Sequence, residues 1–107
     1  MKLFLDDLRD APEGWCRCYC IDELIHAFED KNCHIEAISL DHDLGDSCPS
    51  YMGTFRADTG YDFCLWLIQQ PAEKWPKIIR LHTANSVGKD NMRQLLTHYA
   101  PPGVTIL

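Results

Sequence analysis

The feature that most constrains this chain is a regular alternation of short apolar segments with longer amphipathic ones. Segments of four to six mostly apolar residues have the length of buried strands, and the longer segments repeat apolar residues with the spacing of one helix face. Alternation of this kind predicts βαβ units and a parallel sheet. We expect strands at 2–5, 15–20, 35–40, 77–81 and 104–107, and helices at 22–32, 59–70 and 86–99.

The connections between these segments predict the topology. A parallel α/β sheet of five strands is expected in the order 2-1-3-4-5, as a three-layer structure with helices on both faces. Only about nine residues join the first two strands, which is short for a helical crossover, so we expect a loop there. The length of the chain predicts one domain, residues 1–107.

The ends of the helices carry recognisable capping residues. Thr59 is suited to the N-cap of the helix at 59–70, with Asp62 where its carboxylate reaches back to the cap. Ser86 is suited to cap the helix at 86–99.

Charge and hydropathy exclude several classes of protein. Ten basic and sixteen acidic residues give a formal net charge of −6, which argues against a non-specific grip on duplex DNA. A nucleotide is not excluded, because a cation can reverse the local sign of a carboxylate pocket. The first apolar run is only three residues long, and no segment approaches the roughly 20 apolar residues of a membrane span. We therefore expect a cytoplasmic protein with no membrane partner.

Without a secretory signal, the six cysteines do not predict a disulfide framework. Cys16, Cys18 and Cys20 alternate along one predicted strand, so we expect them to share a face and to pack as small hydrophobic residues.

Three polar clusters follow the predicted strands at the points where the strands end. Asp6 and Asp7 follow the first strand, Asp41-His42-Asp43 follows the third, and His82-Thr83-Ala84-Asn85 follows the fourth. A single aspartate at such a position often only caps the next helix. Three clusters at one edge, beside the switch in strand order, instead predict a ligand site.

These residue types suit phosphoester chemistry. His42 and His82 could act as a general base and a general acid, with Asp41 or Asp43 fixing a ring tautomer. Arg9, Asn85 and the amides of residues 86–88 are candidates for holding phosphate oxygens. Asp6, Asp7 and Asp41 form a set of hard oxygen ligands suited to Mg²⁺, which is the only cofactor that the sequence suggests.

Four motifs together resemble the family of cyclic-phosphate processing receiver-like domains. The first is Leu3-Phe4-Leu5-Asp6-Asp7-Leu8-Arg9 with Pro12 and Trp15, and the second is Ser39-Leu40-Asp41-His42-Asp43-Leu44-Gly45. The others are Thr59-Gly60-Tyr61-Asp62, and His82-Thr83-Ala84-Asn85 with Gly88, Asn91 and Met92. This resemblance covers nearly the whole chain, and it implies a flavodoxin/receiver-like fold.

The resemblance also implies a function and a set of site residues. It implies a phosphoesterase that acts on cyclic phosphates of nucleotides or RNA ends. The catalytic set would be Asp41, His42, Asp43 and His82, and a metal would lie at Asp6, Asp7 and Asp41. Substrate-binding residues would be Arg9, Thr59, Asp62, Thr83, Asn85 and Asn91.

Two other functions stay open at the level of sequence. One is a receiver that accepts a phosphoryl group on Asp41, although no lysine follows the last predicted strand. The other is a module that binds a nucleotide or a protein without turnover. The sequence does not specify the substrate, the bond that breaks or the oligomeric state, and it leaves the segment 46–58 open between a lid and an ordinary surface loop.

Overall fold

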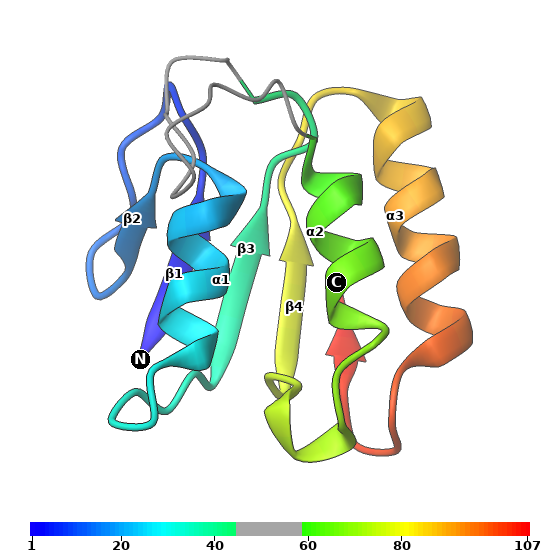
Figure 1. The fold of residues 1–107 in the computed structure, drawn as a ribbon. Coiled ribbons are helices and arrows are strands. Elements are labelled where there is room, and N and C mark those ends of the chain that lie inside the picture. The colour runs from blue at the N-terminus through cyan, green and yellow to red at the C-terminus, as the bar shows by residue number, and fades with distance from the viewer. Residues whose placement is uncertain (45–58) are drawn as a thin grey trace.

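The computed structural model describes residues 1–44 and 59–107, and the segment 46–58, a candidate lid, lies outside them. Figure 1 shows a sheet of strands whose carboxyl ends point to one edge of the molecule, drawn at the top. The five strands of the described chain are all parallel. They are β1 (Lys2–Leu5), β2 (Cys16–Cys18), β3 (Ala37–Leu40), β4 (Ile78–Leu81) and β5 (Thr105–Ile106).

The strand order is β2-β1-β3-β4-β5, which confirms the predicted order. β1 pairs with β2 on one side and with β3 on the other, so it lies beside the switch in strand order. Leu5, Leu40 and Leu81 lie in register across the three central strands. The polar residues that follow each of these leucines are therefore brought to the same edge of the sheet.

The described helices are shorter than the apolar patterns predicted, except for the last one. They are α1 (Ile21–Glu29), α2 (Gly60–Leu67), the short 3₁₀ helix η1 (Ala72–Lys74) and α3 (Ser86–Tyr99). α1 ends before Asp30, whose carboxylate accepts a hydrogen bond from the amide of Asn32 at 2.9 Å and so favours a turn.

Capping agrees with the sequence at α2 and differs at α3. Thr59 and Asp62 form the predicted capping box at the start of α2. The N-cap of α3 is Asn85 and not Ser86, because the Asn85 side chain accepts a hydrogen bond from the Gly88 amide at 3.0 Å.

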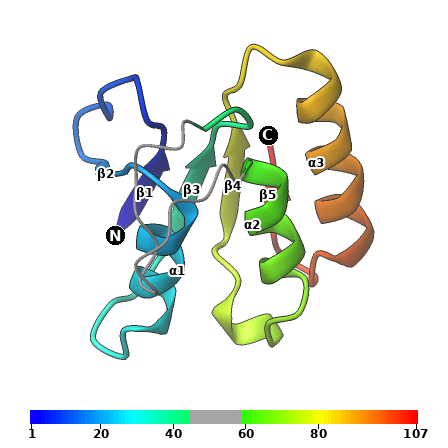
Figure 2. The same ribbon diagram turned by 45° about the horizontal axis from the view of Figure 1, so that its top comes forward.

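In the described chain α1, α2 and α3 all pack on one face of the sheet, so the prediction of helices on both faces is wrong. Figures 1 and 2 show the three helices side by side in front of the strands, with α2 in contact with both neighbours. The crossovers β2–α1–β3, β3–α2–β4 and β4–α3–β5 all run in the same direction along the sheet. Because such crossovers are right-handed, they put their helices on the same face. Only the β1–β2 connection runs the other way, and it contains no helix, as predicted.

The core lies between this helical layer and the facing side of the strands. Leu3 and Leu5 of β1, Ile38 and Leu40 of β3, and their equivalents in β4 point into it. Phe63 of α2 is fully buried at its centre and contacts the rings of Phe28 and Trp66.

The cysteines behave differently from one another. Cys18 is buried, and burial raises the pKa of its thiol to about 12, whereas Cys16 is exposed. Cys20 precedes α1 and is only partly buried, so the expectation that all three pack as small hydrophobic residues holds fully only for Cys18. Among the described residues, no helix has the length and apolarity needed to cross a bilayer.

Phe63 supplies a test of this core. Replacement by Ala should lower the free energy of unfolding by about 3–5 kcal/mol, because a fully buried ring is removed and a cavity remains. Leu65 lies on the same helix but is 38% exposed, so Leu65→Ala should cost less than about 1 kcal/mol. Urea unfolding of both variants measures the difference, and equal losses would contradict the described packing.

Candidate functional site

A buried carboxylate–imidazole pair joins the end of β1 to the end of β4. Asp6 is 1% exposed, and its Oδ2 lies 3.1 Å from Nε2 of His82. The other ring nitrogen of His82, Nδ1, lies 2.7 Å from Oγ of Ser39 in β3. The imidazole also stacks on the ring of Phe4, with 4.2 Å between centroids. Both nitrogens of His82 are thus engaged by the protein itself.

The charges of this pair are set by burial and by hydrogen bonds. Burial lowers the pKa of His82 and outweighs the carboxylates of Asp6 and Asp41, which raise it. Burial alone would raise the pKa of Asp6, but the amides of Arg9 and Leu8 and the ring of His82 hydrogen-bond to its carboxylate and hold the pKa below its usual value. We therefore expect a neutral imidazole beside an ionised Asp6 at neutral pH.

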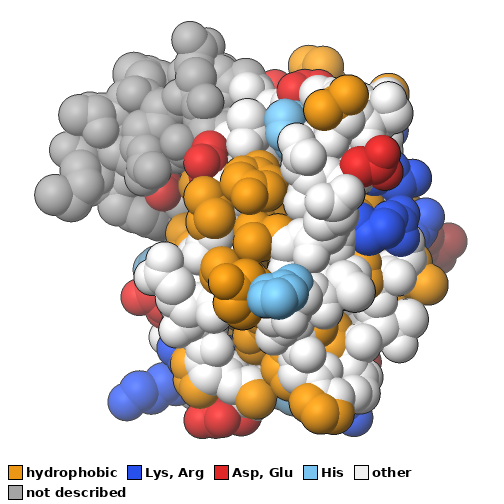
Figure 3. Space-filling view, turned by 90° about the vertical axis from the view of Figure 1, so that its right-hand side faces the viewer, with side chains coloured by type: hydrophobic (Ala, Val, Ile, Leu, Met, Phe, Trp, Pro, Cys, Tyr) orange, Lys and Arg blue, Asp and Glu red, His pale blue; other side chains and the backbone are white. Residues whose placement is uncertain are grey.

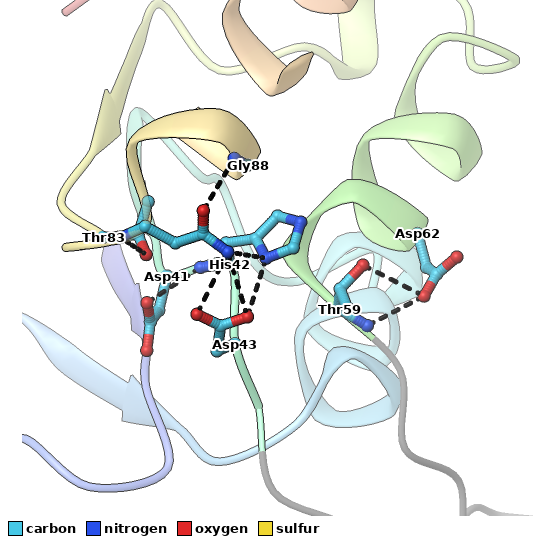
Figure 4. A network of polar contacts seen from close by, with 8 residues as sticks. Asp41, His42, Asp43, Thr59, Asp62, Thr83 and Gly88 are labelled. Carbon is cyan, nitrogen blue, oxygen red and sulfur yellow. Dashed lines mark hydrogen bonds and ion pairs between the residues drawn. The ribbon is translucent and has the colours of Figure 1, made fainter. Parts of the chain in front are cut away.

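The second histidine lies in a separate, more exposed network, shown in Figure 4. Nδ1 of His42 lies 3.0 Å from Oδ1 of Asp43. The Asn85 amide nitrogen lies 3.3 Å from Oδ2 of Asp43 and 3.4 Å from Nδ1 of His42. The hydrogen bond with His42 lowers the pKa of Asp43. No described residue hydrogen-bonds Nε2 of His42, so this nitrogen differs from both nitrogens of His82.

Two glycines let the first turns of helices approach the loop after β3. A Cβ atom on Gly60 would overlap the backbone oxygen of Asp41, and one on Gly88 would overlap the ring of His42. The amide of Gly60 donates to the carbonyl of His42 at 2.8 Å. The first turns of α2 and α3 therefore fix the backbone of the loop after β3 and the ring of His42 that it carries.

The residues predicted to bind a metal are only partly brought together. One ligand atom from each of Asp6, Asp41 and His82 lies within 4.8 Å of the other two. Asp7, a predicted ligand, does not belong to this cluster of the described residues. The donor set is two carboxylate oxygens and one imidazole nitrogen, which suits a divalent cation.

Most of the predicted substrate-binding residues border this region. The Arg9 guanidinium donates to the carbonyl of His82 at 3.2 Å. Thr83 is buried, and its hydroxyl oxygen accepts a hydrogen bond from the backbone N–H of Asn85 at 3.1 Å. Thr59 and Asp62 are joined to each other in the capping box of α2, which Figure 4 shows beside the His42 network.

Asn91 lies apart from the other predicted residues. It is exposed on α3 and, with Tyr61 of α2 and Leu95 and His98 of α3, lines a hollow between the two helices. Figure 3 shows this side of the molecule, where hydrophobic side chains and histidines reach the surface. No hydrogen bond joins Asn91 to the other predicted site residues that the structure describes.

Sequence reasoning did not assign a role to Ser39 or Gly60, and it considered Gly88 only for its backbone amide. Ser39 is fully buried, and the signal for it is a hydroxyl in a strand that is otherwise apolar. For the glycines, the signal is a residue of poor helix propensity in the first turn of a predicted helix.

Comparison with known proteins agrees with this architecture. A family model described as the cyclic-phosphate processing receiver domain matches residues 1–98. The chain belongs to this family. No curated protein and no solved structure gave a match. The resemblance inferred from the four motifs is therefore confirmed, and the fold is that of a receiver-like domain.

Gly88 is the sharpest structural test of this receiver-like site. Gly88→Ala should displace the His42 ring and lower the free energy of unfolding by about 1–3 kcal/mol through overpacking. Ala would otherwise stabilise a helix by about 1 kcal/mol relative to Gly, so the expected sign is opposite to helix propensity. Unfolding in urea and the imidazole resonances of His42 measure the two effects. Ser86→Ala is the control in the same turn, and a stabilised Gly88→Ala with unchanged His42 resonances would refute the packing.

The pKa of His82 supplies a second test, by NMR titration in metal-free buffer. We expect it below 6.5, and lower still in Asp6→Asn, because Asp6 raises it. Since the unfolded chain then binds more protons, the free energy of unfolding should fall as pH decreases from about 6.5 to the folded pKa. Asp10→Asn removes an exposed carboxylate and should leave the His82 pKa unchanged. A His82 pKa above 6.5 would contradict the described burial.

Proposed function

We propose that this domain is a phosphoesterase that opens cyclic phosphates of nucleotides or RNA ends, with His42 as the group that transfers the proton. The observation that carries the proposal is the His42 ring, whose Nδ1 is held by Asp43 while no described residue engages Nε2. The family description links such domains to cyclic-phosphate processing, which agrees with this chemistry.

The hydrogen-bond network assigns the tautomer of His42. Because Oδ1 of Asn85 accepts from the Gly88 amide, the amino group of Asn85 faces Asp43. The Asp43 carboxylate is only an acceptor, so it receives the Nδ1 proton of neutral His42. The lone pair of His42 is then on Nε2, and it can take a proton from an attacking water. Asp43 also stabilises the imidazolium that forms.

His82 has a different role in this proposal from the general acid suggested by the sequence. Its two nitrogens already contact Asp6 and Ser39, so it would have to break one of these contacts to reach a substrate. We assign His82 to positioning the carboxylate of Asp6. When the P–O bond breaks, the leaving oxygen takes its proton from solvent water or from the His42 imidazolium, which returns the ring to its neutral form.

The substrate phosphate is assigned to the basic and amide groups around His42. Arg9 is exposed, and its guanidinium donates to the carbonyl of His82, the residue before Thr83. The amides in the first turn of α3 add the positive end of a helix dipole beside Asn85. Thr83 and Asn85 complete this side, whereas Thr59 and Asp62 border it from α2.

The carboxylates fit a divalent cation. Asp6 and Asp41 supply carboxylate oxygens close enough to share one ion, and burial makes an unshielded pair of carboxylates costly. His82 would join them as a ligand only by exchanging its contact with Asp6 or Ser39. Mg²⁺, when bound there, would offset the negative charge of the phosphate. The protein itself holds Asp6 through the amides of Leu8 and Arg9, and orients Asp41 through the amide of His42 at 2.8 Å.

Phosphorus NMR with a panel of 2′,3′-cyclic, 3′,5′-cyclic and dinucleotide cyclic phosphates, with and without Mg²⁺, tests the activity. We expect a new phosphomonoester or linear diester signal. His42→Ala should lower the rate about 10²–10⁴-fold, the usual contribution of a positioned acid–base group. His34→Ala, an exposed histidine at the opposite end of the sheet, should leave the rate unchanged.

Each other outcome has a definite meaning. Shifted substrate signals without product would refute catalysis and favour a module that sequesters nucleotides. If no cyclic phosphate responds but acetyl phosphate labels Asp41, the domain is a phosphoryl acceptor. Turnover that survives in His42→Ala would refute the role given to His42.

A further inference from the structure

The face of the sheet opposite the helices is not covered by any helix of the described chain. Side chains alternate along strands, so the residues that do not enter the core point to this face. They include the buried Phe4 and Ser39 beneath His82, and exposed residues nearer the other end. The exposed strand residues on this face are Lys2, Ile78, Arg80 and Thr105.

Every charged strand residue on the helix-free face is basic. These residues are Lys2 in β1, Arg17 in β2 and Arg80 in β4, in a chain with a net charge of −6. Arg80 is exposed and makes no ion pair with a described residue. Arg17 pairs with Asp10, whose side chain is 99% exposed, and such a surface pair is readily exchanged. The face is therefore complementary to a polyanion, although the whole domain is acidic.

Planar side chains accompany these charges. The guanidinium of Arg17 lies 4.2 Å from the ring centroid of Tyr19, which is 49% exposed. Trp15 packs edge-on against Phe4, and the Lys2 ammonium lies 5.8 Å from its ring centroid. Exposed rings and stacked guanidinium groups are the surfaces on which unpaired bases stack. An acidic protein partner would pair with the basic side chains, but it has no bases to stack on these planar groups.

The same face leads directly into the proposed site. Nε of Arg17 donates to the backbone carbonyl of Asp6 at 3.1 Å, and Phe4 stacks on His82. Arg80 precedes His82 by two residues on the same face, which corresponds to about 7 Å along the strand. A strand of nucleic acid that lies on Arg80 and Arg17 would thus reach the carboxyl edge of the sheet at Asp6 and His82, where Arg9, one of the groups assigned to the phosphate, contacts the His82 carbonyl.

We infer that the helix-free face binds the phosphate backbone of single-stranded RNA, so that the domain acts on a cyclic phosphate at an RNA end. This inference rests on the proposed function for the chemistry at the end, but not for the binding of the strand. It selects an oligonucleotide over a free cyclic mononucleotide as the preferred substrate.

Fluorescence anisotropy tests binding independently of turnover. The probe is a labelled single-stranded RNA of about ten nucleotides with a 3′-phosphate, a length within the usual site size. Arg80→Glu should weaken binding about tenfold and reduce the slope of log Kd against log salt by about 0.7 for each phosphate that the protein no longer neutralises. Lys31→Glu makes the same charge change at an exposed position after α1, on the helical side, and should leave Kd unchanged. Lys2→Glu is a second variant on the helix-free face and should weaken binding in the same direction.

Three results would overturn the inference. They are equal effects of Arg80→Glu and Lys31→Glu, binding of a polyglutamate peptide as tight as that of the RNA, and an oligonucleotide with a cyclic end that is turned over no better than the cyclic mononucleotide. Failure of the proposed function is distinguishable, because RNA binding that depends on Arg80 would persist without turnover of any cyclic phosphate. Conversely, turnover of cyclic mononucleotides without RNA binding would support the proposed function and refute the inference that the helix-free face binds RNA.

Discussion

The buried pair of Asp6 and His82 is the interaction on which the rest of the site depends. A carboxylate that is 1% exposed is costly unless its oxygens are satisfied, and here the amides of Leu8 and Arg9 and the ring of His82 satisfy them. The pair spans from β1 to β4 across Ser39 of β3. It therefore fixes the start of the loop after β1, the first residue beyond β4 and the stack on Phe4 at once.

Topology explains why the chemistry and the uncovered surface share one molecule. Three right-handed crossovers in the same direction put α1, α2 and α3 on one face, and the single crossover in the other direction is a loop. Loops after β1 and β3 are thus free to carry Asp6, Asp41 and His42 at the carboxyl edge. The strand residues of the opposite face meet no helix of the described chain, and this lack of cover leaves Arg80 exposed and Arg17 partly exposed beside the candidate site.

The sequence predicted the strand order and the edge of the sheet where the polar clusters meet, because both follow from alternation and from polar residues placed after apolar strands. It did not predict that the helices share one face, since periodicity reports that a helix face is buried but not which side of a sheet covers it. The sequence also did not predict that His42 and His82 lie in separate networks. The partner of each ring depends on side-chain direction at adjacent strand-end residues, and the lone hydroxyl of Ser39 in an apolar strand does not show which ring it will contact.

The two histidines divide the work in this account. His82 is buried with both nitrogens engaged and holds Asp6, whereas His42 is held at one nitrogen by Asp43 and packed against Gly88. Only the arrangement of His42 leaves a ring nitrogen, Nε2, that can act as a base in a fixed orientation. The aspartates Asp6 and Asp41 supply negative charge for a cation, and that cation would offset the charge of a phosphate.

The most direct test of the central claim is a crystal structure of the domain with a slowly hydrolysed 2′,3′-cyclic phosphorothioate, in which the sulfur marks the phosphate. The account predicts the attacking-water position within about 3.2 Å of Nε2 of His42, with the phosphate toward Arg9 and the first turn of α3. A phosphate that contacts His82 directly while Nε2 of His42 faces away from it would contradict the account.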